Sequence, residues 1–346
     1  MSSSERVGTA VVGYGYWGVN LARNVAVASS LHLVGVADPD EDRRKAAAGN
    51  YASATTWSNL DAVLDDPDVD AVILAVPAHA HAALATQVLE AGRHVLVEKP
   101  LAMDVEEGRD LVALADDKAL ITMVGHTFLY ASPVHRLKEY VQSGDLGTIQ
   151  YLYSQRLSLG RIRRDCSALW NFGPHDISIM LHLLDERPTE VTARGFSFIG
   201  EGIDDVVFGS LAFPSGVGAN LHVSWIDPRK TRLMTVVGDE KMVIYNDVSA
   251  DQKLWLVDSG VARDAEFGAY ESVGDFQWRT RSGDIIIPRI EMVEPLLAEM
   301  NAFGEACVTG IPPLTDARHG LDVVEVLVAL EQSALVGGTP VEVPPR

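Results

Sequence analysis

An acid, a base and a proline stand together where an apolar run ends in the first third of the chain. Glu98, Lys99 and Pro100 follow residues 94–97, a short apolar segment bounded by turn signals and typical of a buried strand in a parallel sheet. Ligands of open α/β sheets bind at the carboxyl ends of the strands. A lysine at such an end can exchange a proton with a substrate, because partial burial lowers its pKa towards neutrality. The tripeptide therefore predicts a proton-transfer site; the alternative is a solvated lysine in a surface turn.

A glycine-rich turn near the N-terminus is a candidate site for a dinucleotide. The pattern G-x-G-x-x-G lies between an apolar strand and a helix, and its glycines are Gly13, Gly15 and Gly18. The first glycine allows a tight turn, the second lets the backbone approach a pyrophosphate, and the third allows close packing of helix on sheet. Tyr16 and Trp17 stand between the last two glycines and are expected to contact the cofactor.

The strand expected next, residues 31–38, ends at Asp38. A carboxylate there would accept a hydrogen bond from the ribose 2′-hydroxyl and repel a 2′-phosphate, which favours NAD over NADP. The alternative for Asp38 is a turn-forming residue before Pro39. Arg43 and Arg44 lie a turn further on and leave NADP open.

The order of expected elements predicts two domains in an α/β chain. Strands and helices alternate up to residue 126, as in a doubly wound parallel sheet, so we expect an N-terminal Rossmann domain over residues 1–126. The remainder, residues 127–346, is expected to be an α+β domain with a large, mostly antiparallel open sheet, interrupted by a helix over 168–184. The last helix could pack back on the first domain. An open sheet face needs a cover, which predicts a homodimer or homotetramer.

Composition excludes several classes of partner. The chain has 346 residues, a formal net charge of −20 and a pI near 4.8, which argues against nucleic acid and anionic membrane. We expect no signal peptide and no transmembrane run. Cys166 and Cys307 lie far apart and suit a reduced, cytoplasmic protein. His79 and His81 have no carboxylate or third histidine beside them in the sequence, so no metal site is expected.

The helix over residues 168–184 carries His175 and Asp176 near its expected first turn, where Pro174 suits helix entry. Before it, an arginine cluster stands out in so acidic a chain and would suit a diphosphate or carboxylate. Its members are Arg156, Arg161, Arg163 and Arg164. The alternative is a solvated loop or a subunit contact. Tyr130 and Trp225 are further candidates for substrate contact, although a structural role is favoured for the tryptophan.

These features together resemble the glucose–fructose oxidoreductase / inositol dehydrogenase / MocA family of nicotinamide-dependent oxidoreductases. The resemblance runs over most of the chain, and its most recognisable block is residues 71–111. Residues 143–152 and 312–330 also look like family segments. The family's roles carry over to residues of this chain as follows: a pyrophosphate loop at Gly13, Gly15 and Gly18, the ribose acid at Asp38, backbone along the cofactor at Ala75, Val76 and Pro77, the histidine after that strand at His81, a nicotinamide-ribose contact at Glu98, and the catalytic proton-transfer residue at Lys99.

The resemblance departs from the family pattern at one position. The usual Asp-x-x-x-His signature here begins with Asn171 and ends with His175. An asparagine can position a hydroxyl but cannot take a proton, so Lys99 and His175 would share that work. Residues 169–184 and 223–247 look like the branch that acts on nucleotide-linked or amino sugars, such as the 3-dehydrogenases of UDP-N-acetylated hexuronic acids.

The resemblance implies an NAD(P)-dependent enzyme that transfers a hydride between the nicotinamide and a sugar carbinol carbon. Lys99 would remove the hydroxyl proton, His175 would polarise the same oxygen or act as the base, and Asn171 would orient a neighbouring hydroxyl. One alternative is a dehydrogenase of a free polyol or monosaccharide such as inositol, against which Asn171 counts. Another is a non-catalytic, NAD-binding regulatory protein, against which Lys99 and His175 together count.

Overall fold

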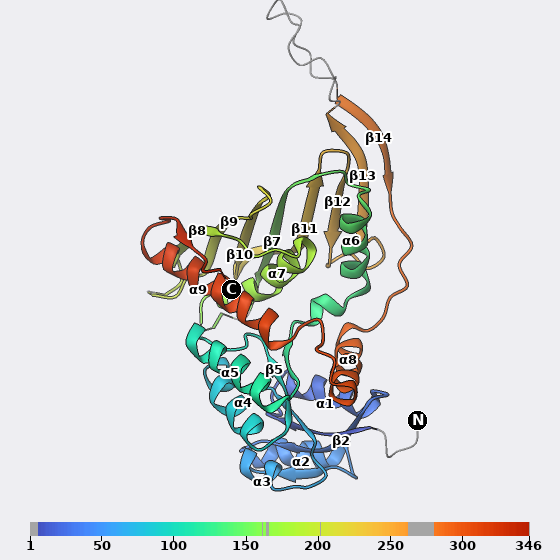
Figure 1. Cartoon of the computed structure of the whole chain (residues 1–346), viewed down its shortest axis with the longest axis vertical. Helices are drawn as coiled ribbons and strands as arrows, with labels where there is room; N and C mark the ends of the chain where they lie inside the picture. The colour runs from blue at the N-terminus through green and yellow to red at the C-terminus, as the bar shows by residue number, and fades with distance from the viewer. Residues whose placement is uncertain (1–5, 161, 164–165, 201, 262–279, 346) are drawn as a thin grey trace, which may run out of the picture. The chain divides into compact units, whose positions relative to one another are not determined.

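The computed structural model describes residues 6–160, 162–163, 166–200, 202–261 and 280–345 (Figure 1). The chain forms two compact units, one of residues 1–131 with 292–328 and one of residues 132–291 with 329–346. This differs from the expected single division at residue 126, because the chain returns to the first unit after the second sheet. The segment that returns to the first unit contains two helices, over residues 295–309 and 317–335. The boundary between the units lies within the second of these helices, after Val328.

The first unit contains a six-stranded parallel sheet of order β3-β2-β1-β4-β5-β6. Its strands are β1 (Val7–Val12), β2 (Leu31–Ala37), β3 (Thr55–Trp57), β4 (Ala71–Leu74), β5 (His94–Glu98) and β6 (Thr122–Gly125). The order reverses between β1 and β4, and ligands of such sheets bind in the crevice at the carboxyl ends beside this switch point. The expected doubly wound sheet is confirmed.

The helices of the first unit are α1 (Gly18–Val27), α2 (Glu41–Asn50), α3 (Leu60–Leu64), α4 (His81–Glu90), α5 (Val105–Lys118) and α8 (Pro295–Thr309), with short 3-10 turns η2 (Ala78–Ala80) and η3 (Thr127–Tyr130). Helices α1 and α8 pack together, and so do α4 and α5, which Figure 1 shows on the other side of the sheet. Met300 and Phe303 of α8 are fully buried in one core with Leu21 and Leu31. Through this apolar face α8 belongs to the first unit, although it begins 170 residues after the end of β6.

The second unit contains a nine-stranded sheet of order β14-β13-β12-β11-β7-β10-β9-β8-β15. Its strands are β7 (Ile149–Leu159), β8 (Glu190–Phe196), β9 (Val206–Ala212), β10 (Gly218–Ser224), β11 (Ile226–Gly238), β12 (Met242–Asn246), β13 (Leu254–Val261), β14 (Thr280–Ile286) and β15 (Val341–Glu342). Neighbouring strands are antiparallel except β7 and β10, which are parallel. The expected mostly antiparallel sheet is confirmed, and β14 and β15 are additions to it.

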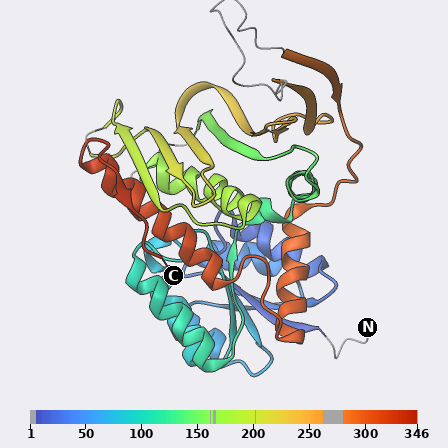
Figure 2. The same cartoon turned by 45° about the horizontal axis from the view of Figure 1, so that its top comes forward.

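Helices cover one face of this second sheet. Helix α7 (Ala168–Leu184) packs on β7, β9 and β10, and α6 (Ser132–Ser143) packs on β12 and on α7 (Figure 2). Lys138 of α6 donates through Nζ to the carbonyl oxygen of His182, 2.6 Å away, and to that of Leu183, so it satisfies carbonyls that the end of α7 leaves open. Helix α9 (Ala317–Leu335) contains the unit boundary, after Val328. Among the described residues, no helix combines the length and apolar character that a membrane crossing requires.

Candidate active site

The glycine loop has the geometry of a dinucleotide cradle. Gly13 has a φ of +95°, and a Cβ built on it would lie 2.4 Å from the carbonyl oxygen of Ala75. A Cβ on Gly18 would lie 1.9 Å from the carbonyl oxygen of Gly13, so both positions require glycine. At Gly15 the nearest atom to a Cβ is Nη1 of Arg43, 3.7 Å away, which leaves the backbone accessible. With α1 beginning at Gly18, these residues fit a pyrophosphate at a helix N-terminus.

Asp38 is buried directly after β2, with an exposed fraction of 2%. Its Oδ2 accepts from the backbone N–H of Tyr14 at 2.7 Å and from Nη1 of Arg43 at 3.4 Å. Its Oδ1 accepts from the N–H of Asp40 at 2.9 Å. Asp38 therefore holds both the glycine loop and its own turn, and its contact with a ribose stays a prediction.

The other end of the glycine loop reaches Glu98. Trp17, at the start of α1, donates its indole N–H to Oε1 of Glu98 at 2.5 Å. Gly125 of β6 leaves room for this carboxyl group, since a Cβ there would lie 3.1 Å from the carboxyl carbon of Glu98. Burial raises the pKa of Glu98 to about 7, against the opposing effects of Lys99 and of the Trp17 hydrogen bond. Tyr16 is exposed.

His81 ties together the ends of two strands. Its side chain is 1% exposed, with Nδ1 2.7 Å from the carbonyl oxygen of Pro100 and Nε2 3.0 Å from that of Val76. Burial lowers the pKa of His81, which favours the neutral ring, and a neutral ring donates to only one of these carbonyls. His81 thus braces the chain after β4 against the turn after Lys99. Ala75 and Val76 are half-buried and Pro77 is exposed, as a cofactor edge would require.

Lys99 is half-buried at the end of β5, and the Lys99–Pro100 peptide bond is cis. The β5–β6 ladder ends at the pair of Glu98 and Gly125, so Lys99 and His126 are the next residues of their chain segments, and the charge of Lys99 acts on His126. His126 is 1% exposed, and its ring meets that of His319 edge to face, with centroids 5.5 Å apart. Burial, reinforced by His319 and Lys99, holds the pKa of His126 well below its usual value.

Glu299 of α8 is a buried acid that sequence reasoning did not single out. It has no exposed surface, and its Oε2 accepts from Oγ1 of Thr127 at 2.8 Å. Burial, reinforced by the charge of Glu98, raises the pKa of Glu299 well above its usual value. The only available signal was an acid on the apolar face of a helix, and that does not say which core the helix joins.

The second unit carries the predicted pair Asn171 and His175 on α7. Four residues apart on a helix, they share one face, and both are half-buried. The side chain of Ser167 caps the helix by accepting from the N–H of Trp170. Pro174 lies inside α7 and not at its entry, so the expectation that His175 belongs to the first turn is wrong.

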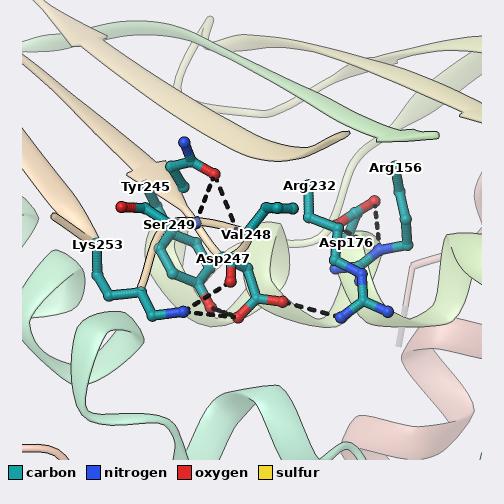
Figure 3. A network of polar contacts seen from close by, with 9 residues as sticks. Arg156, Asp176, Arg232, Tyr245, Asp247, Val248, Ser249 and Lys253 are labelled. Carbon is teal, nitrogen blue, oxygen red and sulfur yellow. Dashed lines mark hydrogen bonds and ion pairs between the residues drawn. The ribbon is translucent and has the colours of Figure 1, made fainter. Parts of the chain in front are cut away.

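Arg156, which we expected to contact the substrate, is buried in an internal ion pair with Asp176. It is 5% exposed, and its Nη2 and Nε donate to the carboxylate of Asp176 at 2.7 Å and 3.1 Å (Figure 3). Arg232 lies opposite Arg156 in the β7–β11 ladder and donates to Asp247 at 2.9 Å. Asp247 also accepts from the hydroxyl of Tyr245 at 3.1 Å. This network joins the sheet to the residue that follows His175.

Two other predicted substrate contacts lie in the cores of their units. Tyr130 is 6% exposed, and its hydroxyl forms a hydrogen bond of 3.1 Å with Thr315, while burial raises its pKa. Trp225 has no exposed surface, which agrees with the structural alternative. Arg163 is half-buried before α7 and stays a candidate. Arg161 and Arg164 lie outside the described residues.

Comparison with models of known families identifies the family to which this chain belongs. The model of the oxidoreductase family with an NAD-binding Rossmann fold, Gfo/Idh/MocA, matches residues 7–126, and that of the Gfo/Idh/MocA C-terminal domain matches residues 134–244. The chain belongs to the Gfo/Idh/MocA family. As in that family, its first unit is an NAD-binding domain of an oxidoreductase, and the expected resemblance is confirmed.

Several known proteins are similar to this chain. UDP-N-acetylglucosamine 3-dehydrogenase of Acidithiobacillus ferrooxidans is 28% identical over 67% of this chain and 72% of its own length. 2,7-Anhydro-N-acetylneuraminate hydratase of Escherichia coli is 28% identical over 61% of this chain and 60% of its own length, so this chain spans less than two thirds of that relative. The crystal structure of GenD2 from gentamicin A biosynthesis, in complex with NAD, superposes on this chain with a TM-score of 0.82 at 26% identity. The matched region covers 99% of this chain and 97% of the GenD2 chain.

Proposed function

We propose that this protein is an NAD-dependent dehydrogenase or reductase that acts on a carbinol carbon of a nucleotide-linked or amino sugar. The observation that carries the proposal is the position of Lys99 at the carboxyl end of β5, next to the Glu98 that the glycine loop contacts through Trp17. A UDP-N-acetylglucosamine 3-dehydrogenase and an enzyme of gentamicin A biosynthesis among the similar proteins support the substrate class.

The chain's contribution to this reaction is proton handling and orientation. Bound NAD supplies or accepts the hydride. Lys99, in its uncharged form, takes the hydroxyl proton during oxidation and returns it during reduction. In the second unit, His175 is the candidate to hydrogen-bond a substrate oxygen, and Asn171 orients a hydroxyl from one helical turn earlier on α7.

The substrate class depends most on Asn171. An amide at this position can orient a hydroxyl but cannot take its proton, which counts against a free polyol. Arg163 is a candidate contact for a phosphate or carboxylate. A free polyol or monosaccharide remains the alternative substrate. A regulatory protein that binds NAD without turnover is the alternative outside the enzymes, and the pairing of Lys99 with His175 in one chain favours the enzyme.

A turnover screen tests the proposal. UDP- and dTDP-linked sugars are compared with inositol and free monosaccharides, each with NAD and NADP, by absorbance of the reduced nicotinamide. We expect the highest kcat/KM with a nucleotide-linked or amino sugar and NAD. Faster turnover of a free polyol would overturn the substrate class, and NAD binding without any turnover would favour the regulatory alternative.

We further propose that the uncovered face of the second sheet binds a second copy of this chain. Tyr151, Tyr153, Phe196 and Phe208 lie on it, each 39% to 47% exposed, and the ring of Phe208 stacks on His222 at 4.3 Å. A face of this kind is typical of a homo-oligomer interface. Light scattering should show a dimer or tetramer that Phe208→Asp weakens; a monomeric wild-type protein would contradict the proposal.

A further inference from the structure

Two carboxyl groups, of the half-buried Glu98 and the fully buried Glu299, interact electrostatically at the carboxyl end of the parallel sheet. Glu98 ends β5 and packs against Gly125 of β6. Two residues beyond Gly125, Thr127 donates to Glu299. Glu299 has no exposed surface, and its Oε1 lacks a hydrogen-bond partner among the described residues. A buried, ionised carboxylate would leave this oxygen unsatisfied at a large cost, whereas a protonated group bears no charge.

We propose that Glu98 and Glu299 form a proton site coupled to the charge of the cofactor, which holds a proton in the cofactor-free protein and releases it when oxidised NAD binds. The inference rests on the NAD-binding fold and not on the sugar proposed above. A failed sugar screen would therefore leave it standing.

The position of the pair relative to the cofactor follows from the order of the strands. The glycine loop follows β1, and Asp38 follows β2 on one side of the switch point. The adenosine half of a dinucleotide extends towards β2, so its nicotinamide half extends towards the ends of β4 and β5. Glu98 stands at the end of β5 and is hydrogen-bonded to the glycine loop by Trp17. The pair therefore lies on the nicotinamide side.

The direction of the coupling follows from charge. The oxidised nicotinamide ring is positive and favours the ionised form of a nearby acid, whereas the reduced ring is neutral. Burial places the pKa of Glu98 at about 7, so a small stabilisation of the carboxylate displaces a proton near neutral pH. By linkage, affinity for oxidised NAD rises with pH, by at most about tenfold per unit, while affinity for NADH stays nearly constant.

Other titratable groups face this pair and have to be separated from it. Lys99 favours the ionised form of Glu98, and Glu294 at the start of α8 opposes ionisation of Glu299. His126 is affected by the charge of Lys99, and its ring contacts that of His319. The indole of Trp17 and the hydroxyl of Thr127 do not titrate near neutral pH. Substitutions that change only the two acids therefore identify the source of a released proton.

Calorimetric titration at pH 7 in buffers of different ionisation enthalpy measures the protons released on binding of NAD and of NADH, without a sugar. We expect release with oxidised NAD and little with NADH. Glu299→Gln should remove most of the release, and Glu98→Gln should do the same. Glu305→Gln, on the exposed side of the same helix, should leave it unchanged.

Equal proton release by wild type and Glu299→Gln would overturn the proposal, as would equal release with NAD and NADH. If Glu299→Gln failed to fold, the wild-type pH profile would decide. An affinity for oxidised NAD that is flat between pH 6 and 8 contradicts the proposal, and one that rises while NADH affinity stays flat supports it.

Discussion

Trp17 and Glu98 are joined by a hydrogen bond of 2.5 Å between residues 81 positions apart. The bond fixes the start of α1 to the end of β5, and so connects the part of the cradle that suits a pyrophosphate to the residue before Lys99. A single side chain thereby connects the glycine loop to the strand end that precedes Lys99.

Trp17→Phe should weaken NAD binding about fivefold, because it removes one hydrogen bond to a carboxyl group, worth about 1 kcal/mol. Calorimetry measures the Kd. Trp255→Phe is the matched control, since its indole N–H has no hydrogen-bond partner among the described residues. Equal NAD affinity for Trp17→Phe and wild type would show that the bond does not order the loop.

Asp38 has two roles that two substitutions separate. Asp38→Asn keeps an acceptor for the N–H of Tyr14 but removes the charge, so the loop should hold while discrimination against NADP falls. Asp38→Ala removes both, so it should relax the selectivity towards NADP and also loosen the glycine loop. The ratio of kcat/KM for the two cofactors tests this, with Asp40→Asn as control. An unchanged ratio in Asp38→Asn would remove the carboxylate from the ribose site.

The Arg156–Asp176 ion pair should be necessary for the stability of the second unit. Arg156→Met leaves Asp176 buried without a counter-charge, which we expect to cost about 3–5 kcal/mol. The double variant with Asp176→Leu should recover most of this loss. Arg136→Met, in an exposed pair with Glu139, should cost less than about 1 kcal/mol. Thermal unfolding compares the variants, and a mild effect of Arg156→Met would show that water solvates Asp176.

Glu299→Gln should stabilise the protein at alkaline pH. The pKa of Glu299 is raised in the folded state, so the folded state retains a proton that the unfolded chain loses above about pH 4.3. Wild-type stability therefore falls as pH rises through this window, and glutamine, which does not ionise, avoids the loss. The Tm difference between Glu299→Gln and wild type should grow from about zero near pH 4 to a clear increase at pH 8. No increase at pH 8 would mean that Glu299 is ionised in the folded protein.

Local patterns predicted most of the fold. The strand and helix alternation up to residue 126 and the helix Ala168–Leu184 follow from periodicity and glycine turns. Two features depended on distant contacts. The apolar stripe of α8 predicts a helix but does not say whether it joins the first or the second core. Strand β14 is largely exposed, so its sequence lacks the apolar alternation of a half-buried strand.

The glycine loop of the candidate cofactor site was likewise predicted from a local sequence pattern. Gly18 is required by its close approach to Gly13, five residues earlier in the same loop, whereas Arg156 and Asp176 meet only after β7 and α7 have packed. An arginine near a predicted site suggests an anionic ligand until its internal partner is known. Glu299 was missed because its neighbours come from η3, far away in the sequence.

The most direct test of the proposed reaction is Lys99→Met, a substitution of similar length without the amine. We expect turnover of the best substrate from the screen to fall at least about a hundredfold, as for loss of a general base, while the calorimetric Kd for NAD stays nearly unchanged. Substantial residual turnover at unchanged NAD affinity would contradict the role of Lys99 as the proton-transfer residue.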